Sequence, residues 1–429
     1  MPSDVGAVHD RPSTSHERRA GRGGGATGAV AVLRVVGLVL LVATIGFSWI
    51  HVPGTSIPVW LLGAGLAATT LVALPNVRLG ALAPVLAAVG VGVAAFLMSA
   101  VVNVEPYLEP TDVIRFARMV LLCVFVHVVV VQLIERPTAA MLFWAAPVSL
   151  VVTLAVLAGP AIDAGVSPLA SLIDAVNAGD PRPITYDVFR VTFDQIDARH
   201  GGLVNVSASF RHQMIRINVV ALALTLIGAG AVFPRHRRSL RLVASLVVAL
   251  VVVSLSRSTL LALGITGFVM AARPLVTGRF GASAAMRLVG VSVVAVVMVP
   301  AVSSLLGNTV TDESGRSYET RSAAISEAWG EAGSAVPFGA DVSDRSEPLT
   351  SPHLLVLDWF LAGGPMGLVA GVALTAVVAL NLWWATARLM RARGGEYLWA
   401  VAAVLCFSLV LVRCLTASGG LLSPSTWIA

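Results

Sequence analysis

The chain has 429 residues, of which 57% are hydrophobic and only 12% are charged, and its mean hydropathy is +0.86. These values lie well outside the range of a soluble globular domain and predict a polytopic membrane protein. All 29 basic residues are arginine, giving a net charge of +6. This positive charge does not indicate a nucleic-acid partner, because arginine placement in a membrane protein first sets its topology.

The chain begins with a polar, Gly-rich stretch of arginines, which predicts a disordered cytoplasmic tail over residues 1–27. Apolar runs of about 20 residues, enough to cross a hydrocarbon core, then recur along the rest of the chain. They predict an all-α transmembrane bundle of about eleven spans, within a range of ten to twelve. The predicted spans lie near residues 28–50, 57–75, 79–102, 112–134, 138–159, 213–233, 239–256, 258–273, 287–306, 354–385 and 396–416.

Two long polar connections divide these spans into three groups. The predicted parts after the tail are transmembrane helices 1–5 at 28–159, a first external loop at 160–212, helices 6–9 at 213–306, a large external loop at 307–353, helices 10–11 at 354–416, and a C-terminal tail at 417–429.

Charge bias orients the bundle. With the N-terminal tail placed inside, the short connections predicted to be cytoplasmic carry many arginines, whereas the two long connections carry more acidic residues than arginines. This distribution obeys the positive-inside rule, so we expect the N-terminus in the cytoplasm and both long loops outside.

Each long loop contains a segment with helical periodicity. In the first, SPLASLIDAV has the apolar spacing of a short amphipathic helix on the membrane surface. In the second, SYETRSAAISEAWGEA also has a helical period, and the Gly/Pro/Asp/Ser stretch after it predicts irregular structure.

The cysteines and one histidine lie inside apolar runs. Cys123, Cys406 and Cys414 match no metal-ligand spacing, so we interpret them as packing residues. His127 lies in CVFVHVVVV, and we expect it to be buried and hydrogen-bonded to a neighbouring helix.

Several arginines lie near the predicted outer ends of spans, where the positive-inside rule predicts few. Such a set at one depth favours a pocket for a multiply charged anion, because guanidinium donors match phosphate oxygens. The alternative is that each arginine snorkels to lipid headgroups or caps backbone carbonyls. The set comprises Arg115 and Arg118, which share one helix face, with Arg211, Arg216, Arg257 and Arg413.

A histidine stands where the large loop ends and the next apolar helix begins. In SPHLLVLDWFLAGGPMGL, His353 places a protonatable group at the membrane surface, and Asp358 follows about one turn later. Asp358 is a candidate to orient His353 or to bind an acceptor. The alternative interpretations are a helix-start histidine bonded to backbone and an aspartate packed near a helix end.

Three segments together resemble the O-antigen ligase and polymerase superfamily of membrane glycosyltransferases. They are RHGGLVNVSASFRHQMIRINVVALALTLIG, SLSRSTLLALGITGFVMA, and ETRSAAISEAW paired with SPHLLVLDWFLAGGPMGL. The resemblance covers about residues 199–385. It implies a bacterial cytoplasmic-membrane enzyme that transfers a glycan from an undecaprenyl-diphosphate carrier to a glycan, lipid or protein acceptor at the outer face.

The resemblance also implies roles for individual residues. His353 would deprotonate the acceptor hydroxyl, and Arg257 and Arg321 would stabilise the departing diphosphate, giving an inverting reaction that uses no metal or other cofactor. The donor diphosphate would be bound by arginines from the outer set and the first loop, namely Arg199, Arg211, Arg216, Arg115 and Arg118. No nucleic-acid partner is expected.

Two other classes of protein share features with this sequence. Peptidoglycan polymerases of the shape and division family use the same carrier but rely on a loop carboxylate. A lipid-linked glycan flippase would be expected to carry paired interrupted helices with charged residues near mid-bilayer.

Overall fold

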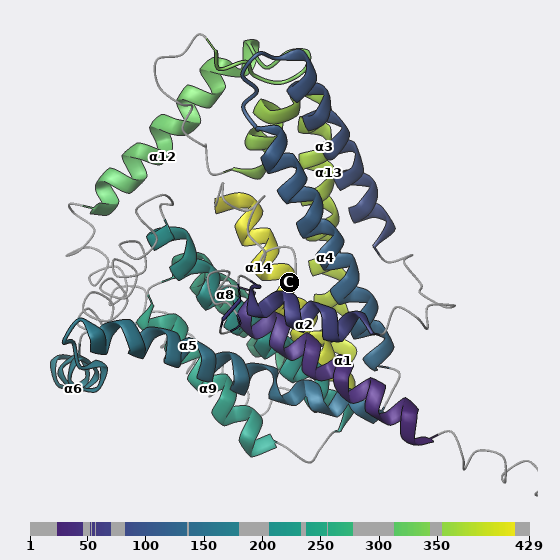
Figure 1. Ribbon diagram of the computed structural model, residues 1–429, viewed down its shortest axis with the longest axis vertical. Helices are drawn as coiled ribbons and strands as arrows, with labels where there is room; N and C mark the ends of the chain where they lie inside the picture. The colour runs from purple at the N-terminus through teal and green to yellow at the C-terminus, as the bar shows by residue number, and fades with distance from the viewer. Residues whose placement is uncertain are drawn as a thin grey trace, which may run out of the picture.

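The computed structural model describes residues 24–45, 52, 54–55, 57–69, 82–134, 137–179, 206–232, 237–254, 256–277, 313–343 and 354–416. These residues are almost entirely helical and form no strand, which confirms the all-α class for the described part of the chain. The bundle is drawn in Figure 1. Its helices are α1 (Gly24–Thr44), α2 (Val59–Ala68), α3 (Ala83–Val102), α4 (Pro110–Ile134), η4 (Pro137–Trp144), α5 (Ala145–Asp163), α6 (Pro168–Ala178), α8 (Val206–Ala231), α9 (Arg237–Val253), α10 (Arg257–Val276), α12 (Glu313–Gly330), η6 (Glu331–Gly333), α13 (Leu355–Arg391) and α14 (Gly395–Thr416).

Several helices are long and apolar enough to cross a membrane, so the protein is a multi-pass membrane protein by length and composition. Three more apolar helices are shorter, at Gly28–Thr44, Val59–Ala68 and Ser258–Pro274, and the predicted span at 239–256 corresponds to α9. The predicted span at 287–306 lies outside the described residues, and the count of eleven stays a prediction. The six long spans among the described residues are Ala83–Val102, Pro110–Leu133, Thr138–Asp163, Gln213–Ala231, Leu355–Arg391 and Gly395–Thr416.

Both expected loop helices are present. α6 covers the SPLASLIDAV segment, and the Oγ of its N-cap Ser167 accepts a 3.3 Å hydrogen bond from the amide of Ala170. Its apolar face is solvent-exposed in the isolated chain at Leu169, Ile173 and Val176, as expected for a helix that lies on a membrane surface. α12 covers most of the second segment. The stretch that follows it forms turns, as the Gly and Pro residues of that stretch predict.

α1 and α2 contact each other through glycines. A Cβ on Gly37 would lie 2.7 Å from the carbonyl oxygen of Gly63, and a Cβ on Gly63 would lie 2.6 Å from the amide nitrogen of Leu41. The two backbones are therefore in contact. Small residues permit this close approach, and the van der Waals packing that results drives helix association in a membrane, where lipid provides no hydrophobic effect between helices. α1 and α2 lie side by side in the middle of the view in Figure 1.

α8 is the central helix, with 89% of its span buried inside the protein. Two of its buried polar side chains bond to a neighbouring helix, which offsets the cost of burying them in an apolar interior. Asn218 donates from Nδ2 to Thr153 Oγ1 of α5 at 2.8 Å, and Thr225 Oγ1 accepts from the amide of Ala146 at 2.9 Å. These bonds set the rotation of α8 relative to α5.

The ends predicted to lie in the cytoplasm meet one another. Arg273 of α10 donates to the carbonyl of Ala392 just after α13, and its guanidinium lies 4.6 Å from the centre of the Tyr397 ring of α14. Trp399 Nε1 of α14 donates to the carbonyl of Ile227 near the end of α8 at 2.8 Å. These contacts place the ends of four helices at one end of the bundle, consistent with the alternation of the predicted spans.

At the other end, α3, α4 and α13 run alongside one another, and α12 extends away above the remaining helices (Figure 1). The start of α13 is fixed to its neighbours by aromatic rings. The Trp359 ring packs edge-to-face against two phenylalanine rings. Its centre lies 5.3 Å from that of Phe96 in α3 and 5.9 Å from that of Phe116 in α4. This packing positions the region in which the sequence predicts the reaction.

Candidate functional site

The predicted site residues fall into three groups in the structure. His353 and Arg199 lie outside the described residues. Arg211 in α8, Arg257 at the first position of α10 and Arg321 in α12 are described by their helices alone. The side chains described in full are those of Arg115, Arg118, Arg216 and Asp358.

α13 is interrupted shortly after its start. Gly363 (φ −143°, ψ 16°) and Gly364 (φ 61°, ψ −151°) leave the helical region directly before Pro365. The Gly364 conformation is open only to glycine, and Pro365 has no N–H with which to bond the carbonyl four residues earlier. That carbonyl belongs to Leu361, and it accepts a 2.7 Å hydrogen bond from the amide of Ala340 in the large loop.

The large loop therefore inserts into the break in α13. A Cβ on Gly339 (φ +99°) would lie 2.6 Å from Ser99 Oγ, and a Cβ on Gly364 would lie 2.8 Å from the carbonyl oxygen of Ala335. Asn103 reaches the same loop, donating from Nδ2 to the carbonyl of Gly339 at 3.3 Å. We call this contact among residues 99–107, 335–343 and 354–364 the outer clasp.

An aspartate organises the second half of the outer clasp. The Asp341 carboxylate accepts from the amides of Val104 at 3.2 Å, Glu105 at 3.3 Å and Ser343 at 3.0 Å. Hydrogen bonds from Ser343 chiefly, and from Val104 and Glu105, lower the pKa of Asp341, because they stabilise the charged form. The backbone adds a 2.9 Å bond from the amide of Val342 to the carbonyl of Glu105.

Asp358 belongs to the outer clasp and is only 2% exposed. Its Oδ1 accepts a 2.9 Å hydrogen bond from the hydroxyl of Tyr107. The observed surroundings of Asp358 are thus internal, and contact with an acceptor would require the clasp to open. Through this bond and the Trp359 cluster, the outer clasp fixes the residues that directly follow His353 in the sequence.

Two arginines of the outer set are buried near each other. Arg216 of α8 is 2% exposed and Arg413 of α14 is 7% exposed, and they lie close enough for their charges to repel. Burying two like charges together is unfavourable in a medium of low dielectric constant. The structure thus brings into one place two arginines that are far apart in the sequence.

Arg115 and Arg118 lie elsewhere, on an exposed face of α4. The Arg115 side chain is 62% exposed and its Nη1 lies 3.3 Å from Asp112 Oδ1, one turn earlier in the same helix. An exposed pair of this kind contributes little stability. The described geometry gives these two arginines no contact with the Arg216 and Arg413 pair.

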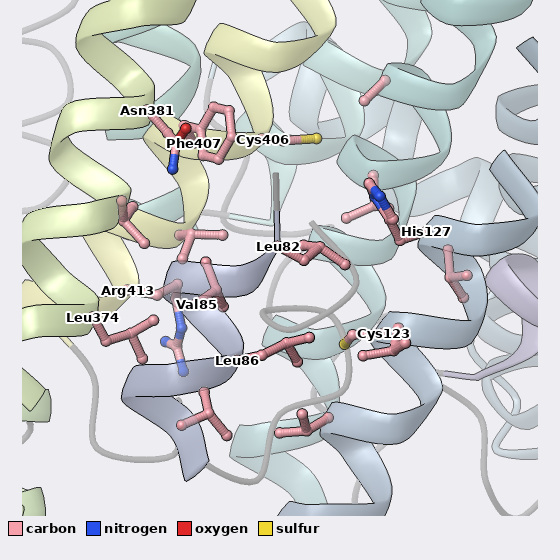
Figure 2. Close-up of a pocket in the computed structure, with 18 of the residues that line it drawn as sticks. Leu82, Val85, Leu86, Cys123, His127, Leu374, Asn381, Cys406, Phe407 and Arg413 are labelled. Atoms are coloured by element: carbon pink, nitrogen blue, oxygen red, sulfur yellow. The ribbon is translucent and has the colours of Figure 1, made fainter. Parts of the chain in front are cut away.

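A cavity of about 360 Å³ lies beside Arg413, where the first half of α3 meets α4, α8, α13 and the second half of α14. Its walls are mostly aliphatic. Figure 2 shows the Arg413 guanidinium on one side of the cavity and His127 on the other, with Leu82, the N-cap of α3, and Leu86 of α3 between them in this view. The third polar side chain in the wall is Asn381.

The cavity also changes the interpretation of residues assigned to packing. All three cysteines of the chain, Cys123, Cys406 and Cys414, line it, and so does His127. None of these four residues is a site residue predicted from the sequence. The sequence shows three cysteines and a histidine inside apolar spans. That they line one cavity becomes visible only when the helices are packed together.

No family model, curated protein or solved structure matches this chain. The chemistry of the site therefore rests on its own residues. Within the described residues, no group of three or more His, Cys, Asp or Glu side chains is arranged to hold a metal ion. The cations that the described region offers to an anionic ligand in its interior are guanidinium groups.

Proposed function

We propose that this protein is a membrane glycosyltransferase of the O-antigen ligase or polymerase type. It transfers a glycan from an undecaprenyl-diphosphate carrier to an acceptor hydroxyl at the outer face of the bacterial cytoplasmic membrane. The observation that supports this proposal most directly is the burial of Arg216 beside Arg413 within the bundle.

A diphosphate is the ligand chemistry that suits such a pair. The two guanidinium groups are both positively charged and buried, and a multiply charged anion bound between them would be attracted by both. Guanidinium also presents a planar fork of donors that matches phosphate oxygens in a bidentate geometry. A monovalent anion would offset less of the combined positive charge.

The reaction then needs a base and stabilisation of the leaving group. His353, two residues before α13 in the sequence, removes the proton of the acceptor hydroxyl as that oxygen attacks the anomeric carbon. The bond between that carbon and the diphosphate oxygen breaks, and Arg257 and Arg321 stabilise the negative charge that develops on the diphosphate. A single displacement of this kind inverts the anomeric configuration.

The outer clasp supports this scheme by holding the start of α13 rigid. Catalytic groups require positional accuracy of about half an ångström, and rigid elements supply it better than loops do. Bonds from Ala340 to Leu361 and from Tyr107 to Asp358 connect the large loop and the α3–α4 connection to the first turns of α13. The acceptor identity, whether glycan, lipid or protein, determines whether the protein is a polymerase or a ligase.

The proposal is tested by the donor affinity of arginine variants in the purified full-length protein. Arg216→Gln and Arg413→Gln are each expected to weaken binding of undecaprenyl diphosphate by about tenfold or more, because each removes a charge-assisted contact. Arg391→Gln, at the exposed end of α13, is the matched control and should bind normally. Unchanged donor affinity in both buried-arginine variants contradicts the proposal.

A second candidate is translocation of the lipid-linked glycan across the membrane. The break at Gly363 and Gly364 favours it, since interrupted helices are typical of transporters. The two functions separate in His353→Ala, which abolishes glycan transfer in the first case and leaves flipping intact in the second.

A peptidoglycan-polymerase reaction would instead be lost when the acidic residues of the large loop are neutralised while His353 is retained.

A further inference from the structure

α13 contains more residues than one membrane crossing needs. A continuous helix of its 37 residues would be about 55 Å long, whereas a hydrocarbon core is about 30 Å thick. The break at Gly363 and Gly364 divides α13 into a first arm, residues 355–362, and a second arm, residues 365–391. The second arm alone is about 40 Å long, which is enough to cross. The first arm therefore has another role.

The two arms lie against each other and run in opposite directions. In a continuous helix, residues 356 and 371 would be about 22 Å apart. In the structure, a Cβ on Gly371 would lie 3.2 Å from the Cα of Val356, and a Cβ on Gly367 would overlap the carbonyl oxygen of Trp359. The later residue of the second arm thus meets the earlier residue of the first arm, which is the pairing of an antiparallel hairpin.

Glycines make the hairpin possible. Gly364 has a φ of 61°, a backbone conformation that side chains disfavour, and it lies where the chain reverses. Gly367 and Gly371 are four residues apart and both face the first arm. This is the spacing at which small residues let membrane helices approach until their backbones are in contact.

α3 shows which way the first arm points. A Cβ on Gly363 would lie 2.7 Å from the Cβ of Ala95, which is in the second half of α3, towards the outer clasp. At the other end of the arm, Leu355 lines the cavity together with Val85 and Leu86 from the first half of α3. Since α3 is itself long enough to cross a membrane, the arm extends about 12 Å from the clasp into the bundle.

We infer that the first arm of α13 is a re-entrant helix, which begins inside the bundle and returns to the outer clasp without crossing the membrane. Such a segment is tolerated at membrane depth where protein surrounds it, and every residue of the arm is buried or half-buried. The large loop is held at the clasp by residues 335–343, so it delivers Leu354 into the interior. The inference concerns the path of the chain and does not rest on the proposed glycosyl transfer.

A pair of cysteines tests the hairpin in the full-length protein in phosphatidylcholine nanodiscs. Val356→Cys combined with Gly371→Cys should form a disulfide on oxidation with copper phenanthroline, because the two positions are in contact. Val356→Cys combined with Leu380→Cys is the matched control. Leu380 lies about 14 Å further along the second arm, beyond the reach of a disulfide. Peptide mass identifies the linked pair against the three native cysteines.

A charged thiol reagent that does not enter lipid tests whether the arm begins inside the bundle. Single variants Ser343→Cys and Leu354→Cys are treated with methanethiosulfonate ethyltrimethylammonium in the same nanodiscs. Ser343 is exposed at the clasp, whereas Leu354 is half-buried at the inner end of the arm. Leu354→Cys should therefore react at least about tenfold more slowly. Thermal unfolding verifies that both variants are folded.

The inference is supported if only the pair at 356 and 371 cross-links and Leu354→Cys is the slower thiol. It is overturned if that folded double variant forms no disulfide, or if the control pair links equally well. Reaction of Leu354→Cys as fast as Ser343→Cys also overturns it, because a helix that starts at the surface predicts equal rates. The labelling result decides by itself if a double variant does not fold.

Discussion

The hydroxyl of Tyr107 lies 2.9 Å from Oδ1 of Asp358, although the two residues are 251 positions apart in the chain. This bond joins the connection between α3 and α4 to the first turn of α13, within the outer clasp. It provides a donor to one oxygen of a carboxylate that is almost fully buried. The position of the predicted catalytic region is therefore coupled to the N-terminal half of the bundle.

Tyr107→Phe should destabilise the protein by about 1–3 kcal/mol, because a buried acceptor loses its donor. Thermal unfolding in one fixed detergent measures the loss. Asp358→Asn and the double variant complete a cycle that isolates the pair. If the bond matters, the double variant will be less destabilised than the two single effects added together, and simple additivity would show that it does not.

Gly92 provides the close approach of α3 to α13. A Cβ there would lie 2.6 Å from the Trp359 ring, so Gly92→Ala should cost about 1–3 kcal/mol through overpacking. Gly90, two residues earlier, has open space around its Cβ position and serves as the control. Gly90→Ala should be neutral or slightly stabilising, because alanine favours helix. Equal unfolding temperatures for the two variants would contradict the observed packing.

Gly339 holds the loop inside the break of α13. Its φ is positive, and a Cβ at this position would lie 2.6 Å from Ser99 Oγ. Gly339→Ala should therefore open the outer clasp at a cost of about 1–3 kcal/mol. Gly330→Ala, at the end of α12 where nothing lies near the Cβ position, should leave the clasp closed. Limited proteolysis of residues 335–343 distinguishes the two, and equal cleavage rates would argue against the clasp.

The outer clasp should weaken in acid. The pKa of Asp341 is lowered in the folded protein, so its stabilising effect is present above the unfolded value, about 3.9, and is lost as the pH falls through the folded value. Hydrogen exchange at the amides of Val104, Glu105 and Ser343 should therefore lose protection as the pH falls below about 4. Asp341→Asn is the reference, and it should show weak protection at every pH. A wild type that matches this variant throughout would exclude the proposed contribution of the carboxylate.

His353→Ala should abolish glycan transfer while the protein is still inserted at normal abundance, because no other group is proposed to accept the hydroxyl proton. His127→Ala is a useful comparison, since it removes an imidazole from a different part of the bundle. Transfer is measured with purified protein, a lipid-linked donor and acceptor. Full activity of His353→Ala would remove the base from the mechanism.

Some features were predictable because they depend on local composition. Long apolar runs predict helices for any packing, and α3, α4, α13 and α14 appear close to their predicted boundaries. The short helices α6 and α12 follow from period and capping within a few residues of chain. The span that contains Gly363, Gly364 and Pro365 was predicted as one helix, although its break is also a local effect of those residues.

The site depended on packing, which hydropathy does not encode. Lipid tails are as apolar as leucine, so the partner of each helix face is chosen by small residues, hydrogen bonds and shape. The sequence placed Arg216 and Arg413 at one predicted depth together with Arg115 and Arg118, as members of one set of arginines suited to an anion. Only the rotation of α8, α14 and α4 about their axes buries the first pair and exposes the second. The same rotations bring three separate thiols to one cavity, because rotating a helix about its axis changes what a residue contacts without changing its depth.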